Sequence, residues 1–253
     1  NWVSPDEIIS KSGKKYLKNN TSKEIKVGPS ESMSKSKKNT IDPENIINNY
    51  GADSVRLFIL SDSPPEKDVQ WSEEGIVAAH KFIQKLWTLH SKIIKEINKD
   101  HPKDASAEFT KFTNKFIKKI SNNLENFSYN IIIANLHEMY SFLIKEIDKG
   151  YQVETILQNY KKILITMNPI IPHFSNECLE IVCKNNDERI WPSYDEKQLK
   201  EISSLIVVQI NGKKRGLINT KINVTELDIM QKIKNDQKIS KYLTGNEIKK
   251  KIY

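Results

Sequence analysis

Five consecutive stripes of apolar residues at helical spacing fill the middle of the chain, and they constrain its fold more than any other feature. The first stripe runs from Ile76 to Ile97, and the others lie within residues 109–120, 132–147, 153–167 and 174–182. Apolar residues three or four positions apart share one side of a helix, and that side must be buried. Because the connections are short, we expect an antiparallel helical bundle over residues 72–190, with the aromatic residues of the stripes in its core.

The period changes from helix to strand after Trp191-Pro192. Residues 205–210 read as a buried strand, and Asn211-Gly212 is a strong signal for a type I′ hairpin turn. The elements expected after the turn are a strand near Leu217–Ile222, a helix through Ile229 and Ile233 capped by Asn223 or Thr225, a short helix near Ile239–Leu243 ending at Gly245, and a strand at Ile248–Tyr253. We therefore expect a small α+β domain at residues 203–253.

Positive charge is concentrated in this last domain. Residues 205–253 contain eleven Lys and Arg against four Asp and Glu, whereas residues 1–204 contain 29 against 28. A basic domain on a nearly neutral body is typical of a protein that binds a phosphate backbone. The alternative is a lysine-rich surface from an AT-rich genome, since Asn and Ile are also frequent.

Composition excludes several other classes. The chain is 38% hydrophobic and 28% charged, which fits a globular protein, and no apolar run reaches the ~18 residues of a membrane-spanning helix. Its first residues contain neither an initiator Met nor a signal peptide, so we expect a fragment of a larger, cytoplasmic protein. Cys178 and Cys183 are expected to be reduced, buried thiols, and the histidines form no metal-ligand cluster with them.

Residues 1–40 are poor in periodic apolar residues and favour short strands and loops. Within them, Ser32-Met33-Ser34-Lys35-Ser36 is a small-residue loop with hydroxyl groups, backbone N–H groups and an ammonium group. Such a loop suits a polyphosphate whose negative charge increases during reaction, although a solvated basic loop is the alternative. Asp42-Pro43 should start a short helix that stops before Gly51, and Asp53 should cap the next helix.

The loop resembles the Lys-Met-Ser-Lys-Ser signature of class I aminoacyl-tRNA synthetases. Residues 50–58, Tyr-Gly-Ala-Asp-Ser-Val-Arg-Leu-Phe, resemble the helices that follow this signature. Residues 63–75 resemble the leucyl members of the class, and residues 207–216, Val-Val-Gln-Ile-Asn-Gly-Lys-Lys-Arg-Gly, resemble their bacterial-type C-terminal domain. The resemblance covers residue 27 to the end.

This resemblance implies a mainly helical chain with a small α+β domain. Residues 1–71 would be the end of a Rossmann-type catalytic domain with its signature loop and stem-contact helices. Residues 72–190 would be an anticodon-binding bundle, and residues 203–253 a tRNA-binding domain. The implied reaction is attack of leucine on Mg-ATP to give leucyl-adenylate, followed by transfer of the leucyl group to tRNA-Leu, with no metal site in this segment.

The resemblance also assigns residue roles in the ATP loop. Lys35 aligns with the signature lysine that stabilises the phosphates and is the expected catalytic residue, while Met33, Ser34 and Ser36 would shape the ATP-binding loop. Ser32 departs from the signature, where many members have lysine. Lys37 or Lys38 could supply the charge instead.

Four basic residues are candidates for tRNA binding. Lys213, Lys214 and Arg215 follow the hairpin turn, where they could meet phosphates without reading bases. Their alternative role is solubility. Arg56 is the fourth candidate, and a structural ion pair is equally compatible with its position. His173, after Pro172, should be a capping or core residue.

Three arrangements fit these observations. The chain is expected to be part of a synthetase that is inactive alone, because the other class I signature and the leucine pocket are not in it. The alternatives are a separate subunit of a split synthetase, completed by an N-terminal catalytic partner, and a tRNA-binding protein that has lost catalysis. In a tRNA-binding protein that has lost catalysis, Lys35 would have no function.

Overall fold

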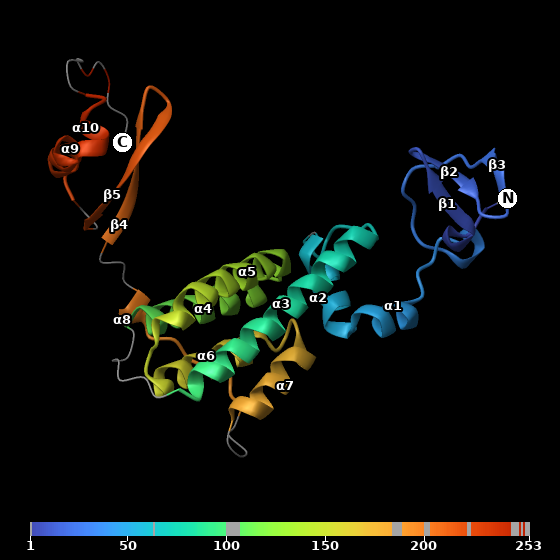
Figure 1. The fold of residues 1–253 in the computed structure, drawn as a ribbon, viewed down its shortest axis with the longest axis horizontal. Helices are drawn as coiled ribbons and strands as arrows, with labels where there is room; N and C mark the ends of the chain where they lie inside the picture. Colours follow the sequence, from blue (N-terminus) through green and yellow to red (C-terminus); the bar gives the residue numbers. More distant parts are fainter. Residues whose placement is uncertain are drawn as a thin grey trace. The chain divides into compact units, whose positions relative to one another are not determined.

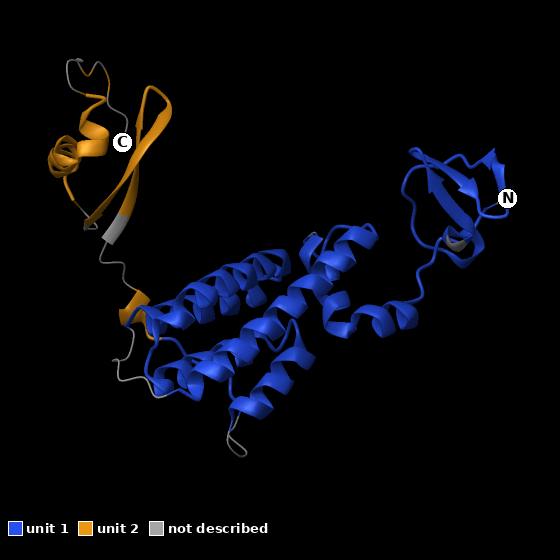
Figure 2. Cartoon of the chain, in the orientation of Figure 1, with its two compact units in different colours: residues 1–194 blue, residues 195–253 orange. Residues whose placement is uncertain are grey.

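The computed structural model describes residues 2–62, 64–99, 107–183, 189–199, 203–221, 224–243, 248 and 250. The chain divides into two compact units, residues 1–194 and residues 195–253, which Figure 2 colours separately. The order of elements along the chain is labelled in Figure 1. The described residues are mainly helical with small antiparallel sheets, as the sequence predicts.

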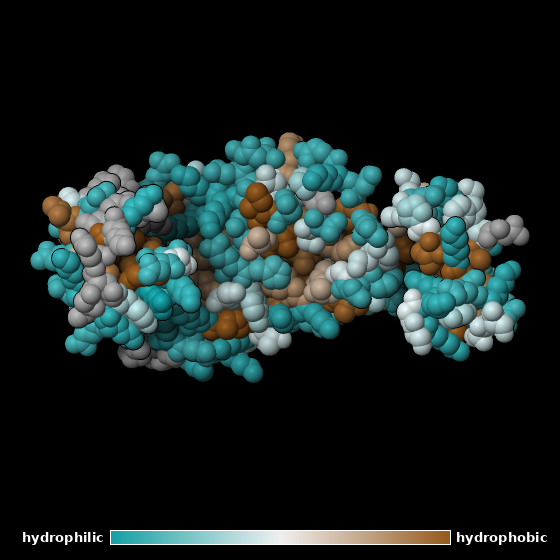
Figure 3. Space-filling view, turned by 90° about the horizontal axis from the view of Figure 1, so that it is seen from above, coloured by the Kyte–Doolittle hydropathy of each residue, from teal (hydrophilic) through white to brown (hydrophobic). Residues whose placement is uncertain are grey.

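The first unit begins with an antiparallel three-stranded sheet in the order β1-β2-β3. Its strands are β1 (Ile8–Lys11), β2 (Lys14–Leu17) and β3 (Asn20–Glu24), preceded by a 3-10 turn η1 (Pro5–Glu7). No residue of this sheet is fully buried, and Figure 3 shows hydrophobic residues uncovered on it. Because both sheets of the described residues are antiparallel, the expected Rossmann-type remnant, which would pair strands in parallel, is not confirmed.

Two helices connect the loop region to the bundle. Helix α1 (Pro43–Tyr50) starts at Asp42, whose carboxylate accepts the Glu44 N–H at 3.1 Å. It ends at Gly51, whose φ of 82° lies in the region that glycine adopts without strain. Helix α2 (Ala52–Asp62) follows at once. The predicted start and end of the first of these helices are confirmed.

The five predicted stripes form five helices. These are α3 (Glu73–Ile97), α4 (Ala107–Glu125), α5 (Tyr129–Glu146), α6 (Val153–Met167) and α7 (Pro172–Val182), with a 3-10 turn η3 (Ile147–Lys149) after α5. Helix α4 packs on α5 and α6, α6 packs on α7, and α2 packs on α3 and α5. Residues 100–106, between α3 and α4, lie outside the described residues.

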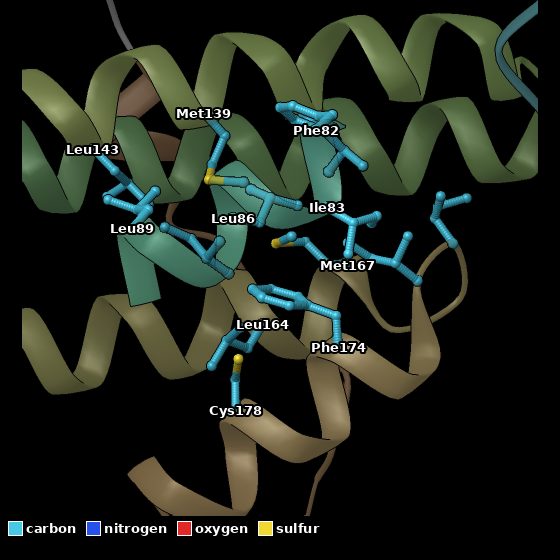
Figure 4. Packing of buried hydrophobic residues seen from close by; sticks show 14 of the residues in the cluster. Phe82, Ile83, Leu86, Leu89, Met139, Leu143, Leu164, Met167, Phe174 and Cys178 are labelled. Carbon is cyan, nitrogen blue, oxygen red and sulfur yellow. The ribbon is translucent and has the colours of Figure 1, made fainter. Parts of the chain in front are cut away.

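The apolar stripes meet in one core, which Figure 4 shows at close range. Leu86 of α3 lies among Met139 of α5 and Met167 of α6, and each of the three is at most 2% exposed. Burial of one such side chain stabilises the folded chain by about 1.5–3 kcal/mol. The core also contains Phe109, Phe116 and Phe174, as the sequence predicts, whereas Trp87 of the first stripe is 37% exposed and does not lie where it was expected.

The second unit is a hairpin covered on one face by two helices. Strands β4 (Ser203–Ile210) and β5 (Lys213–Lys221) pair antiparallel, and α9 (Glu226–Asn235) and α10 (Gln237–Ser240) pack on β5. A short helix α8 (Glu196–Leu199), which the sequence did not predict, precedes the hairpin. The small core consists of Val208, Ile218, Ile233 and Ile239.

The turn and the helix cap in this unit behave as predicted, but the expected burial of residues 205–210 is wrong, since Leu205 and Val207 are 61% and 50% exposed. Asn211 and Gly212 have φ values of 52° and 73°, the pair of positive values that a type I′ turn requires. Thr225 caps α9 by accepting the Asp228 N–H. The alternative cap Asn223, the helix end at Gly245 and most of the predicted strand at residues 248–253 lie outside the described residues. Among the described helices, none is long and apolar enough to cross a membrane.

Candidate functional site

The loop at residues 28–40 is folded around the side chain of Asn39. Its Oδ1 accepts the Ser34 N–H at 2.7 Å, and its Nδ2 donates to the Ser32 carbonyl at 3.3 Å. Residues 35–37 then form one 3-10 turn, η2 (Lys35–Lys37), and Lys38 adopts a left-handed conformation with φ of 53°. Asn39 thus closes a six-residue ring, residues 34–39, on the candidate ATP loop, a role that the sequence did not reveal.

The lysines of this loop differ in what they contact. Lys37 forms an ion pair with Glu31, and the hydroxyl groups of Ser34 and Ser36 lie 2.7 Å apart. Lys35 is exposed, and within the described residues no hydrogen bond or ion pair engages its ammonium group. The structure therefore leaves Lys35 available for a ligand, whereas the charge of Lys37 is already balanced.

Asp53 does not cap its own helix, so that expectation is wrong. Its carboxylate is 6% exposed and accepts hydrogen bonds from the N–H groups of His173 (3.3 Å) and Phe174 (2.7 Å). It also lies 3.0 Å from Nδ1 of His173. Asp53 is thus the N-terminal cap of α7, and the side chain of His173, 74% exposed, is not in the core.

Arg56 also contacts the start of α7. Its Nε donates to the Ile170 carbonyl at 2.9 Å and one Nη donates to the Pro169 carbonyl at 2.6 Å. Arg56 thus has a structural role, but its partners are carbonyl groups, and the ion pair suggested by the sequence is not seen among the described residues. A tRNA contact of Arg56 stays a prediction.

The hairpin separates the three basic residues that follow its turn. Lys213 pairs with Ile210 and Lys214 with Gln209, and both are exposed. The register shifts at the next position, so that Gly216 faces Val208 and Arg215 is the extra residue of a β-bulge. The structure thus places the two lysines near the turn and turns Arg215 away from them, toward Tyr242 of its own unit.

Ionisable groups in the bundle core serve packing. Burial raises the pKa of Cys178 to about 12, and burial also raises the pKa of Tyr160, beside which Cys178 lies. Neither cysteine forms a disulfide; Cys178 is buried as predicted, whereas Cys183 is only partly buried, so that part of the expectation is wrong. Among the described residues, no group of three His, Cys, Asp or Glu is placed to hold a metal ion.

Two protein families match the chain. Residues 106–244 match the anticodon-binding domain of tRNA ligases, a stretch that begins one residue before α4 and includes α10. Residues 25–72 match the class I tRNA synthetases for isoleucine, leucine, methionine and valine. The second match contains the candidate ATP loop together with α1 and α2.

Curated relatives cover the whole chain. A leucine–tRNA ligase of Bartonella tribocorum is 37% identical over 92% of the chain, and one of Orientia tsutsugamushi is 36% identical over 100%. The chain spans 28–30% of the length of these relatives, in their C-terminal part. A crystal structure of a LeuRS of Agrobacterium radiobacter in ternary complex with tRNA and LeuAMS has a TM-score of 0.67, with 22% identity over 87% of this chain and 30% of that one. That likeness concerns the fold.

Proposed function

Because the chain belongs to the family of anticodon-binding domains of tRNA ligases, we propose that it is the tRNA-binding, C-terminal part of a leucine–tRNA ligase. The enzyme would use ATP, with magnesium, to convert leucine to leucyl-adenylate and would then transfer the leucyl group to tRNA-Leu. The observation that carries this proposal is the similarity of nearly every residue of the chain to leucine–tRNA ligases.

In this proposal Lys35 stabilises the negative charge that develops on the leaving pyrophosphate. A positioned ammonium group lowers the barrier to nucleotidyl transfer without covalent chemistry. The availability of Lys35 and the ring closed by Asn39 support the assignment. Met33, Ser34 and Ser36 would shape the loop around the ATP phosphates.

The remaining segments would bind tRNA. Residues 1–71 would end the catalytic domain, residues 72–190 would form the anticodon-binding bundle, and residues 203–253 would contact the tRNA backbone through Lys213 and Lys214. Two exposed lysines beside a tight turn can approach phosphates closely. Arg56 and Arg215, whose guanidinium groups make contacts within the chain, are the weaker tRNA candidates. The cytoplasmic location stays a prediction.

The two alternatives are less well supported. A non-catalytic tRNA-binding protein would have no use for the loop that matches the class I synthetases and leaves Lys35 open to solvent. A separate subunit is less favoured because, in the relatives, the matched segment is part of one longer chain. Both alternatives share the expected affinity for tRNA.

Binding of tRNA-Leu to this chain, measured by filter retention over a series of salt concentrations, tests the tRNA role. We expect the logarithm of the affinity to fall steeply as the logarithm of the salt concentration rises, because phosphate contacts release counterions. The chain ending at residue 202 is the matched variant. Equal affinity of the two forms, or a flat salt response, would remove the basic domain from the proposal.

Exchange of pyrophosphate into ATP by the intact enzyme tests the ATP role. We expect Lys35→Ala to slow leucine-dependent exchange by about 100-fold or more, since it removes a charge used in the transition state. Lys26→Ala, an exposed lysine outside the loop, is the control. A near-normal exchange rate in Lys35→Ala would contradict the assignment.

A further inference from the structure

Three polar residues in the first part of α2 hold three other elements of the first unit. Asp53 contacts the start of α7, Arg56 contacts the turn before α7, and Ser54 contacts the end of α1. We refer to Asp53, Ser54 and Arg56 as the α2 clamp. The sequence positions that these contacts join lie up to 121 residues apart.

The Tyr50 carbonyl, at the end of α1, is shared by Ser54 of α2 and His80 of α3. Ser54 donates its hydroxyl hydrogen to the Tyr50 carbonyl at 2.7 Å, and Nδ1 of His80 lies 2.9 Å from the same carbonyl. Because a carbonyl only accepts, Nδ1 of His80 carries the proton, and its Nε2 accepts from Gln84 at 3.0 Å. His80 and Gln84 both belong to α3, so the last carbonyl of α1 is tied to the bundle.

The other two residues of the clamp, Asp53 and Arg56, both form hydrogen bonds with the turn between α6 and α7. Asp53 satisfies two of the free N–H groups at the N-terminus of α7, where a negative charge is also favoured by the helix dipole. Arg56 satisfies the Pro169 and Ile170 carbonyls just before that helix. Asp53 and Arg56 lie three residues apart on α2. The anion thus binds N–H groups and the cation binds carbonyl groups of the same turn.

Burial makes this arrangement sensitive to change. A carboxylate that is 6% exposed is stable only when its oxygens are hydrogen-bonded, and a buried charged group left unpaired is strongly destabilising. Apolar residues of similar size often stabilise a core as well as buried charges do. The contribution of these polar contacts is therefore to favour one arrangement of the packed helices rather than to add stability. The geometry specified here is the position of α1 and α2 relative to α3, α6 and α7.

Helix α1 begins at Pro43, four residues after Asn39, which closes the candidate ATP loop. Resting on the proposed function, we infer that Asp53, Ser54 and Arg56 are positioning residues for leucyl transfer. They hold the loop that serves the adenylate and the helices that bind tRNA in one fixed relation, through the Tyr50 carbonyl on one side and the α6–α7 turn on the other. A loosened clamp leaves each site intact and misplaces the tRNA end relative to the adenylate.

Three measurements on the intact ligase carrying Asp53→Asn test this inference. The amide keeps the size of the carboxylate but loses its charge and one acceptor. We expect pyrophosphate exchange and the tRNA dissociation constant to stay within about twofold of the unmodified enzyme, while kcat for leucylation at saturating tRNA falls at least about tenfold. Replacement of a residue that only stabilises the fold would instead lower exchange and kcat together and raise the tRNA dissociation constant.

Glu154→Gln is the matched control, because Glu154 lies in the first turn of α6 and contacts Gln158 of its own helix. It should leave all three quantities unchanged. Arg56→Lys and Arg56→Ala provide a second test: lysine can satisfy one of the two carbonyls, so its kcat should lie between those of Arg56→Ala and the unmodified enzyme.

Parallel loss of exchange and transfer, or unchanged transfer in both Asp53→Asn and Arg56→Ala, would overturn the inference. The unmodified enzyme tests the proposed function separately. If it neither exchanges pyrophosphate with leucine nor charges tRNA-Leu, the proposed function fails whatever the clamp variants do.

Discussion

The guanidinium group of Arg215 lies over the ring of Tyr242, with its central carbon 4.1 Å from the ring centroid. The bulge in β5 directs Arg215 to this position, and within the described residues its buried Nε has no hydrogen-bond partner. A cation over an aromatic face is stabilised by the ring quadrupole. The contact ties the hairpin to the segment after α10, and it distinguishes Arg215 from the exposed Lys213 and Lys214.

This difference predicts unequal effects on tRNA binding. Lys213→Ala and Lys214→Ala should each weaken binding and reduce the slope of log affinity against log salt by about 1, because each removes one phosphate contact. Arg215→Gln should leave the slope nearly unchanged and lower the stability of the second unit by roughly 1 kcal/mol through loss of the ring contact. Filter binding over a salt series measures the slopes. An equal reduction of the slope in Arg215→Gln would mean that Arg215 also contacts the tRNA.

Gly216 allows α10 to approach β5 closely. A Cβ at this position would lie 2.4 Å from Cδ1 of Ile239, which is fully buried in the small core. Gly216→Ala should therefore destabilise the second unit by about 1–3 kcal/mol, the usual cost of overpacking a core. Hydrogen exchange of the β4 and β5 amides measures the loss. Asn219→Ala, at an exposed site of the same strand, should change the free energy of unfolding measured by this exchange by less than about 0.5 kcal/mol.

Gly75 has the same role between α2 and α3. Alanine in a helix is favoured over glycine by about 1 kcal/mol, but here its Cβ would lie 2.5 Å from the ring of Phe58. Since overpacking costs about 1–3 kcal/mol, Gly75→Ala should leave stability unchanged at best and lower it by up to about 2 kcal/mol. Urea unfolding followed by helical circular dichroism measures the change. Gly28→Ala, where a Cβ meets nothing within 4 Å, is the control, and a stabilised Gly75→Ala would contradict the packing.

His90 makes the stability of the bundle depend on pH. Burial lowers the pKa of His90 below its ordinary value of 6.5, and a protonated imidazole carries an N–H on both nitrogens, of which Nε2 has no partner among the described residues. The unfolded chain then binds more protons than the folded chain around pH 6, so stability falls as pH falls below about 6.5.

Urea unfolding at about pH 5 and about pH 7.5 measures this loss. His90→Asn, which keeps a polar atom near the Tyr160 hydroxyl 3.0 Å from Nδ1, should make the loss smaller. Some loss should remain, because burial and then Lys85 also lower the pKa of His137. An identical loss in His90→Asn would exclude His90 as its source.

The lysines of the ATP loop give a prediction about Ser32. Lys37 is neutralised by Glu31, so Lys38 is the better candidate for the charge that many class I synthetases carry at the position of Ser32. Lys38→Ala should slow pyrophosphate exchange by the intact enzyme several-fold, and Ser32→Lys added to it should restore the rate. Lys37→Ala is the control and should have little effect. Failure of Ser32→Lys to restore exchange would mean that the two positions are not equivalent.

Much of the fold could be read from the sequence because the signals involved are local. Apolar residues three or four apart predicted α3 to α7, and the predicted stripes lie inside the observed helices. The hairpin turn and the caps at Asp42 and Thr225 need only neighbours within a few residues. The parallel sheet expected before the loop was inferred from the resemblance, and the described strands there pair antiparallel.

The candidate site was predictable in part. Residue types and order located the ATP loop, but the sequence could not show that Glu31 takes Lys37 or that Asn39 closes the loop. Nor could it show that a bulge would remove Arg215 from the hairpin tip, since register depends on how both strands pair.

The sequence by itself thus determined the helices of the bundle, the hairpin turn and the caps at Asp42 and Thr225, and which sides of the bundle helices are buried. Tertiary structure alone decided the partners of Asp53 and Arg56, which bind backbone groups more than 110 residues away. The physical reason is that helical periodicity and capping depend on atoms within one or two turns. A polar side chain buried between helices takes whichever donor or acceptor the packed helices bring within 3 Å or so of it, and no local pattern specifies that.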